Sequence, residues 1–195
     1  MLFRSVKAMS NLRKDSNTRE QCAEIACEIE MNKCGYPVGK QDQYAAAFGG
    51  MNLFEFKRNG SVSVQPIGIT KPSIQGLQDK LMLVYSGRGR DANNILQKQQ
   101  KAMTNVDKFK IVQRARDKAY TARDLITQGK LDDFGDLLHQ SWLDKKGVCE
   151  EITQDYFDNV YDKAMKAGSL GGKILGAGGG RSEEHTSELQ SQSTI

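Results

Sequence analysis

The sequence lacks any long apolar run, and this absence argues against a membrane protein. No stretch approaches the roughly 20 consecutive apolar residues that a helix needs to cross a bilayer. The first residues also lack the basic start and apolar middle of a secretory signal. With 38% hydrophobic and 27% charged residues in a chain of 195, the composition is typical of one globular domain or two small ones. We therefore expect no membrane span and a cytoplasmic location.

Cysteine and histidine are too scattered to indicate a metal or redox site. The four cysteines show no C-x-x-C spacing and have no histidine nearby in the sequence, which argues against zinc and against a redox pair. We interpret them as small buried side chains in a reducing compartment. These cysteines are Cys22, Cys27, Cys34 and Cys149.

The formal net charge is only +4, and basic residues alternate with acidic ones, as in residues 114–118. Interspersed signs are typical of a solvated helix face. The single tryptophan and the lack of aromatic–basic interleaving give little support to a nucleic-acid surface, and we expect no nucleic-acid partner. A mild positive charge would suit an anionic substrate.

The two ends of the chain look foreign to the rest. Residues 181–195 resemble the translation of a common sequencing-library adapter, and residues 1–5 resemble the opposite strand of the same adapter. A natural polar tail is the alternative. We expect both stretches to be artefactual and leave them out of the fold prediction. His185 then has no function, and the natural protein is expected to continue in both directions.

The remaining chain is predicted to be α+β, in the order helix, hairpin, strand, several helices and glycine-rich turn. The first helix is expected over residues 17–34, where apolar residues recur at helical spacing. Thr18 and Gln21 are predicted to form a capping box at its start. Gly35 and Pro37 are predicted to end it.

A hairpin and a buried strand are expected next. Residues 53–56 and 62–64 lie on either side of an Asn-Gly pair, which is a strong hairpin signal between alternating apolar residues. Residues 66–79 are richer in proline, glycine and serine and indicate a domain junction. The short apolar run 81–85 predicts a buried strand.

Helical periodicity dominates the second half of the sequence. Residues 91–127 predict either one long helix or two helices that break near Thr104 and Asn105, with Gly129 closing the region. Two further helices are expected over residues 131–146 and 154–167.

The glycine-rich segment 171–180 is one candidate for chemistry. It does not fit the Walker pattern, because residue 167 is not glycine and no serine or threonine follows Lys173. It also misses the dinucleotide fingerprint, which needs a glycine in place of Arg181. Glycines still let backbone N–H groups approach an anion. From spacing alone, an anion-binding loop and a flexible linker both stay open.

Asp42 is the other candidate. It is expected in a loop, beside Lys40, Gln41 and Gln43. A phosphoryl-transfer enzyme needs a carboxylate within hydrogen-bond reach of the attacking hydroxyl. Loop aspartates also serve turns and caps, and the residues alone do not identify the site.

Two segments together carry a resemblance to a known family. Residues 39–50 resemble the catalytic-aspartate segment of the GHMP kinases; their sequence is Gly-Lys-Gln-Asp-Gln-Tyr-Ala-Ala-Ala-Phe-Gly-Gly. Within this family, they are most similar to the branch that contains the heptose 7-phosphate kinases. Residues 166–180 resemble that family's third motif, a glycine loop close to the nucleotide phosphates. The motifs stand in the family's order, and the resemblance covers residues 6–180. The first and second motifs, which shape the sugar site and hold the ATP triphosphate, are not found.

The resemblance implies roles for individual residues. Asp42 would be the catalytic carboxylate. Glu30 would ligate Mg²⁺, with an exposed helix-end acid as the alternative. ATP and Mg²⁺ are the implied cofactors. The implied sugar contacts are Lys40, Gln41 and Tyr44. The implied phosphate-loop residues are Gly176, Ala177, Gly178, Gly179 and Gly180.

The resemblance also implies a domain organisation and an activity. Residues 6–75 would be the end of the N-terminal α/β domain, and residues 76–180 an incomplete, helix-rich, ferredoxin-like C-terminal domain. The implied activity is ATP-dependent phosphorylation of a sugar phosphate, at the anomeric hydroxyl of heptose 7-phosphate, for nucleotide-activated heptose. Because two motifs are missing, we expect this polypeptide alone to be inactive. We also expect it to fold poorly, because severed sheets leave unpaired strand edges.

Two other classes of function stay open. Within the same family, the substrate could be fucose, galactose or a mevalonate type. Outside it, residues 91–167 could form a non-catalytic helical binding module.

Overall fold

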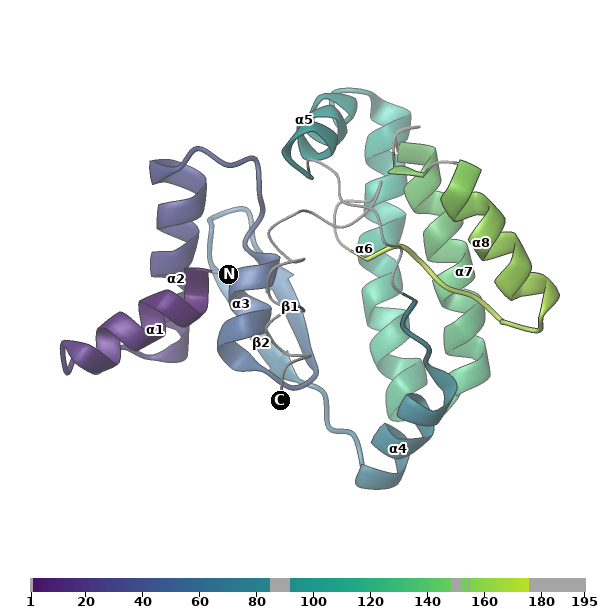
Figure 1. The fold of residues 1–195 in the computed structure, drawn as a ribbon, viewed down its shortest axis with the longest axis horizontal. Helices are drawn as coiled ribbons and strands as arrows, with labels where there is room; N and C mark the ends of the chain where they lie inside the picture. The colour runs from purple at the N-terminus through teal and green to yellow at the C-terminus, as the bar shows by residue number, and fades with distance from the viewer. Residues whose placement is uncertain (1, 85–91, 149–151, 154, 176–195) are drawn as a thin grey trace. The chain divides into compact units, whose positions relative to one another are not determined.

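A computed structural model describes residues 2–84, 92–148, 152–153 and 155–175. The chain forms two compact units, Met1–Ile67 and Gly68–Ile195 (Figure 1). Their division falls inside the junction predicted over residues 66–79. Within the described part of the chain, every helix is too short or too polar to cross a bilayer.

The first unit begins with helices. They are α1 (Leu2–Leu12), α2 (Arg19–Cys27), the π-helix η1 (Glu28–Lys33) and α3 (Gln41–Phe48). The predicted capping box at the start of α2 is confirmed: Thr18 Oγ1 accepts a hydrogen bond from the Gln21 N–H at 3.2 Å, and Gln21 Oε1 accepts one from the Thr18 N–H at 2.8 Å. The predicted first helix is confirmed as α2, continued by η1.

The predicted hairpin is confirmed. Strands β1 (Asn52–Phe56) and β2 (Val62–Pro66) pair antiparallel, with Phe54 opposite Val64. The turn between them needs glycine at residue 60, where φ is 84°, because side chains rarely adopt this conformation.

The core of the first unit joins α2 and α3 to the hairpin. The side chains of Ala23, Cys27, Tyr44 and Ala47 are buried, and partly buried Phe54, Val62 and Val64 pack against them. Val6, Cys22 and Ala26 form a second cluster that fixes α1 to α2. The prediction of buried cysteines holds for Cys22 and Cys27 and is wrong for Cys34, which is exposed. Cys149 lies outside the described residues.

In the described residues of the second unit, the regular secondary structure is helical. Its helices are α4 (Lys71–Lys80), α5 (Ala92–Ala102), α6 (Val106–Thr127), α7 (Leu131–Val148) and α8 (Asp155–Lys166). Asn105 decides between the two predictions for residues 91–127, because its Oδ1 accepts hydrogen bonds from the N–H groups of Asp107 and Lys108 and starts a new helix. Gly129, with φ of 72°, follows the end of α6.

Helices α6, α7 and α8 lie side by side in the second unit (Figure 1). Trp142 of α7 is only 1% exposed, and it packs with Ile95, Val148 and Ile152 in one cluster. Partly buried Tyr161 of α8 and Ile174 cover this cluster. The core therefore extends from α7 to the segment that leads into the predicted glycine loop.

The predicted buried strand over residues 81–85 is wrong where the structure describes it. Residues 81–84 form no strand, and their side chains are between 54% and 86% exposed. Tyr85 lies outside the described residues. A buried strand needs neighbours for its backbone N–H and C=O groups. In the described part of the chain, β1 and β2 pair only with each other.

Candidate active site

Asp42, the predicted catalytic carboxylate, lies on the first turn of α3. The helix begins at Gln41, directly after Lys40 at its N-cap position, so the predicted loop at Asp42 is wrong. The reason is local, because no glycine or proline interrupts the chain between Gly39 and Gly49, and the alanines of this stretch favour a helix. The Asp42 side chain is exposed, and it makes no hydrogen bond or ion pair with any described residue.

Glu24 on α2 binds Lys40 and Tyr44, which lie two positions before and two positions after Asp42. Its carboxylate accepts hydrogen bonds from Lys40 Nζ, which is 2.9 Å from each carboxylate oxygen, and from the Tyr44 hydroxyl. Lys40 Nζ also donates to Gly60 O at 3.1 Å, in the turn between β1 and β2. One ion pair and its hydrogen bonds therefore connect α2, α3 and the hairpin.

These contacts change the acidity of the groups that make them. Burial raises the pKa of Glu24, but the hydrogen bonds from Tyr44 and Lys40 and the charge of Lys40 lower it by more, so that this pKa lies below its ordinary value. Burial and the Glu24 carboxylate both raise the pKa of the Tyr44 hydroxyl, which therefore stays protonated as a donor. Burial, with the nearby Glu24 charge, also raises the pKa of the Cys27 thiol to about 11, so this thiol is unreactive.

Glu30, the predicted Mg²⁺ ligand, contacts α3 through Gln43. The Gln43 side chain is 3% exposed, and its Nε2 donates a hydrogen bond to Glu30 Oε2. Gln43 Oε1 is also buried, with no hydrogen-bond partner among the described residues. Glu30 belongs to the π-helix η1, and such segments are frequent at functional sites. Gln43, the residue next to Asp42, therefore links Glu30 to α3.

The structure gives each predicted sugar contact a position. The polar groups of Lys40 and Tyr44 bind Glu24, whereas Gln41 is exposed at the start of α3. The role of all three residues in substrate binding stays a prediction.

Glu24 and Gln43 are the residues of this site that the sequence prediction missed. A signal for Glu24 was present, because it stands between the buried residues Ala23 and Ala26 on α2. An acid beside a buried helix face needs partners. Which residues provide them depends on how α2 packs against α3, and the sequence pattern does not contain this information.

The second unit holds the start of the glycine-rich segment against α7. A Cβ atom on Gly171 would lie 2.1 Å from Gly135 O and 2.7 Å from His139 N, so only glycine permits this approach. The Tyr161 hydroxyl of α8 lies 2.6 Å from His139 Nδ1, and a Cβ atom on Gly172 would lie 3.7 Å from the Tyr161 ring. Helices α7 and α8 therefore anchor the residues just before the predicted phosphate loop.

The predicted phosphate-loop residues themselves lie outside the described residues. They are Gly176, Ala177, Gly178, Gly179 and Gly180. Their assignment to a phosphate loop stays a prediction.

The chain resembles several known proteins in sequence and fold. Residues 122–182 match the sequence profile of the family described as GHMP kinases C terminal. The chain is 29% identical, over 82% of its length, to the D-glycero-alpha-D-manno-heptose 7-phosphate kinase of Campylobacter jejuni. It is 23% identical, over 90% of its length, to the bifunctional fucokinase/GDP-fucose pyrophosphorylase of Arabidopsis thaliana.

A solved structure shares the fold. The crystal structure of a D-glycero-D-manno-heptose 1-phosphate kinase from Bacteroides thetaiotaomicron matches 96% of this chain with a TM-score of 0.64, at 24% sequence identity. The chain spans 52% of that structure, 47% of the Campylobacter protein and 17% of the Arabidopsis protein. The fold class predicted from the sequence, α+β with the GHMP kinase fold, is confirmed. Residues 122–182 are therefore similar to the C-terminal domain of the GHMP kinases, and the solved structure shares the fold of the chain.

Proposed function

We propose that this chain is part of a longer cytoplasmic protein that transfers a phosphoryl group from ATP to a sugar phosphate. The proposed acceptor is the anomeric hydroxyl of a heptose 7-phosphate, and the product would enter the synthesis of nucleotide-activated heptose. The 29% identity to the heptose 7-phosphate kinase of Campylobacter supports this choice of acceptor.

The observation that carries the proposal is the setting of Asp42. Its exposed carboxylate has no partner among the described residues, whereas Lys40 and Tyr44, two positions before and after it, are both bound to Glu24. A carboxylate that is free while its neighbours are held is available to a ligand. In the proposed reaction, Asp42 orients the attacking hydroxyl or accepts its proton. Gln41, Lys40 and Tyr44 would contact the sugar.

The described residues are compatible with a Mg²⁺ ion that is shared with a nucleotide. They include no group of three acidic, histidine or cysteine side chains that could hold a metal ion by themselves. Mg²⁺ is usually bound by one or two carboxylates together with substrate phosphates. Glu30, whose carboxylate is oriented by Gln43, offers one such ligand. When bound, ATP and Mg²⁺ would supply the phosphoryl group and balance its charge.

The proposal is tested with the complete natural protein and a panel of acceptors. Heptose 7-phosphate, unphosphorylated heptose, fucose, galactose and mevalonate are each incubated with ATP, and ADP release is measured. We expect turnover with heptose 7-phosphate and a product that carries a phosphate on its anomeric carbon, detected by phosphorus NMR. ADP release that is independent of every acceptor would contradict the proposal.

The role of Asp42 is tested by Asp42→Asn, which keeps the shape of the side chain and removes its charge. We expect kcat to fall by about 10²–10⁴-fold, the usual contribution of a general base. Asp107→Asn is the matched control, because Asp107 occupies the corresponding position on the first turn of α6. Equal activity of Asp42→Asn and the unmodified protein would exclude Asp42 as the base.

Fucose is the second candidate substrate, favoured by the 23% identity to the Arabidopsis fucokinase. A preference for fucose over heptose 7-phosphate in kcat/KM would move the assignment to that substrate. The reaction would remain a sugar phosphorylation.

A further inference from the structure

Glu24 has no role in the reaction proposed above, yet its carboxylate binds two residues of the Lys40–Tyr44 segment, where α3 begins. Both of its oxygens lie 2.9 Å from Lys40 Nζ, and one of them also accepts the Tyr44 hydroxyl hydrogen bond. Lys40 and Tyr44 lie one helical turn apart, and the first backbone hydrogen bond of α3 joins the Tyr44 N–H to Lys40 O at 3.2 Å. Glu24 therefore binds both ends of the helical turn that contains Asp42.

The same turn is also fixed to the hairpin and to the aromatic core. Lys40 Nζ donates to Gly60 O. The Tyr44 ring contacts Phe48, Phe54 and Phe56, with ring centroids between 6.0 and 6.5 Å apart. Glu24 therefore holds the hydroxyl of Tyr44 and the hairpin aromatics hold its ring, which restricts rotation of the turn about the helix axis.

The charges explain why Asp42 is left free. Lys40 is the basic residue closest to Asp42 in sequence, and its ammonium is paired with Glu24. Without Glu24, the Lys40 ammonium would be free to pair with another carboxylate, and Asp42, two residues away, is available. Glu24 therefore keeps Lys40 from occupying the carboxylate that the reaction needs.

We infer that Glu24 is a positioning residue for Asp42: through Lys40 and Tyr44 it holds the first turn of α3 and leaves the Asp42 carboxylate free for a substrate hydroxyl. The catalytic meaning of this inference rests on the proposed function. The Lys40 and Glu24 side chains are 25% and 45% exposed, and ion pairs this exposed contribute little to stability. Misplacement of a catalytic group by about 1 Å, in contrast, can lower the rate about 100-fold.

The test compares Glu24→Gln with Glu20→Gln in the complete natural protein. Glu20 is exposed on the same helix, so both variants remove one negative charge from α2. For Glu24→Gln we expect kcat to fall roughly 10- to 100-fold with KM changed less than about threefold. For Glu20→Gln we expect neither to change. In amide hydrogen exchange at Tyr44 and Ala45, Lys40→Arg, which keeps a donor for Glu24, should match the unmodified protein, and Lys40→Met should match Glu24→Gln.

A second measurement does not depend on activity. Amide hydrogen exchange at Tyr44 and Ala45 reports the first turn of α3, and we expect Glu24→Gln to accelerate it at least about tenfold while amides in α7 stay unchanged. If Glu24→Gln does not fold, Lys40→Met and Tyr44→Phe provide the same comparison.

The outcomes separate the two claims. A protein that phosphorylates no sugar contradicts the proposed function, and the exchange rates then decide whether Glu24 orders the turn. An active protein whose Glu24→Gln variant keeps both kcat and exchange rates would overturn the inference alone. A rise in KM at constant kcat would also overturn it, because Glu24 would then be a substrate contact.

Discussion

Lys145 is a half-buried cation near the predicted glycine loop. It lies on α7, with its Nζ 3.5 Å from Ile174 O. Burial, together with repulsion from Lys173, lowers the pKa of Lys145 to about 8. Partial burial of an ammonium destabilises the folded state, because the charged group loses hydration.

We expect Lys145→Met to stabilise the chain at pH 7 by about 1–3 kcal/mol. The lowered pKa means that the unfolded chain binds more protons than the folded chain between about pH 8 and 10.5. The stability of the unmodified chain therefore rises with pH in this window, so the difference in unfolding free energy between Lys145→Met and the unmodified chain should become smaller. Urea unfolding at pH 7, 8.5 and 10 measures the difference.

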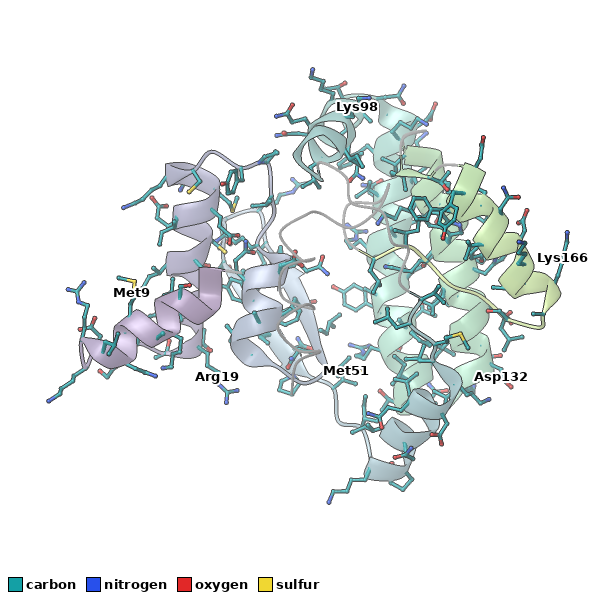
Figure 2. The ribbon with its side chains drawn as sticks, in the orientation of Figure 1. Met9, Arg19, Met51, Lys98, Asp132 and Lys166 are labelled. Carbon is teal, nitrogen blue, oxygen red and sulfur yellow. The ribbon has the colours of Figure 1, made fainter. Side chains whose placement is uncertain are left out.

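Lys166→Met is the control for this prediction. Lys166 is exposed near the end of α8 (Figure 2), and its replacement should change stability by less than about 0.5 kcal/mol at every pH. A gain for Lys145→Met that persists unchanged at pH 10 would contradict the explanation by burial.

At the scale of elements, one carboxylate joins the two longest helices of the second unit. Asp144 of α7 binds Arg114 Nη2 at 3.1 Å and Lys118 Nζ at 2.7 Å, both on α6, and its side chain is 16% exposed. Burial raises the pKa of Asp144, but the hydrogen bonds and charges of Lys118 and Arg114 lower it by more, so this pKa lies below its ordinary value. The ion pairs therefore favour the charged carboxylate and the packing of α6 on α7.

We expect Asp144→Ala to destabilise the chain by about 1–3 kcal/mol at pH 7, because two cations lose their partner. A lowered pKa contributes stability above the unfolded pKa, and this contribution is lost as the pH falls through the folded value. The difference in stability between Asp144→Ala and the unmodified chain should therefore disappear in acid. Thermal unfolding followed by circular dichroism between pH 7 and 3 tests both statements.

Asp132→Ala provides the comparison on the same helix. Asp132 pairs with Lys80, but its side chain is 70% exposed at the start of α7 (Figure 2). Its loss should cost less than about 0.5 kcal/mol. If both substitutions lowered the stability equally, the ion pairs of Asp144 would contribute no more than the exposed pair of Asp132.

At the scale of the molecule, the apolar residues 81–84 favour association of the chain with other molecules. These four residues are exposed in the described structure, and exposed apolar segments promote association. Their exposure supports the expectation that the chain by itself folds poorly. The same expectation applies to nucleotide binding, because the family's triphosphate-binding motif is not found in these 195 residues.

We expect the 195-residue chain to bind ATP with a dissociation constant above about 1 mM, which corresponds to less than about 4 kcal/mol of binding free energy. Isothermal titration calorimetry with Mg²⁺ present measures it, and the complete natural protein is the reference. Micromolar binding by the chain alone would show that the described units already contain the main nucleotide site.

The amino-acid sequence by itself determined the features that depend on neighbouring residues. The capping box of Thr18, the hairpin turn at Gly60 and the cap at Asn105 all follow from local backbone and side-chain chemistry. The two motif segments, residues 39–50 and 166–180, also indicate the family, because each is a continuous stretch of chain.

Only the tertiary structure decided which residues surround Asp42 and whether residues 81–84 are buried. Glu24 is 16 residues before Lys40 and 20 before Tyr44, and the three meet because α2 packs on α3. An apolar run is buried as a strand only when another strand pairs with it, and none of the described strands does so. Contacts between distant segments depend on how whole elements pack, and no local pattern records that packing.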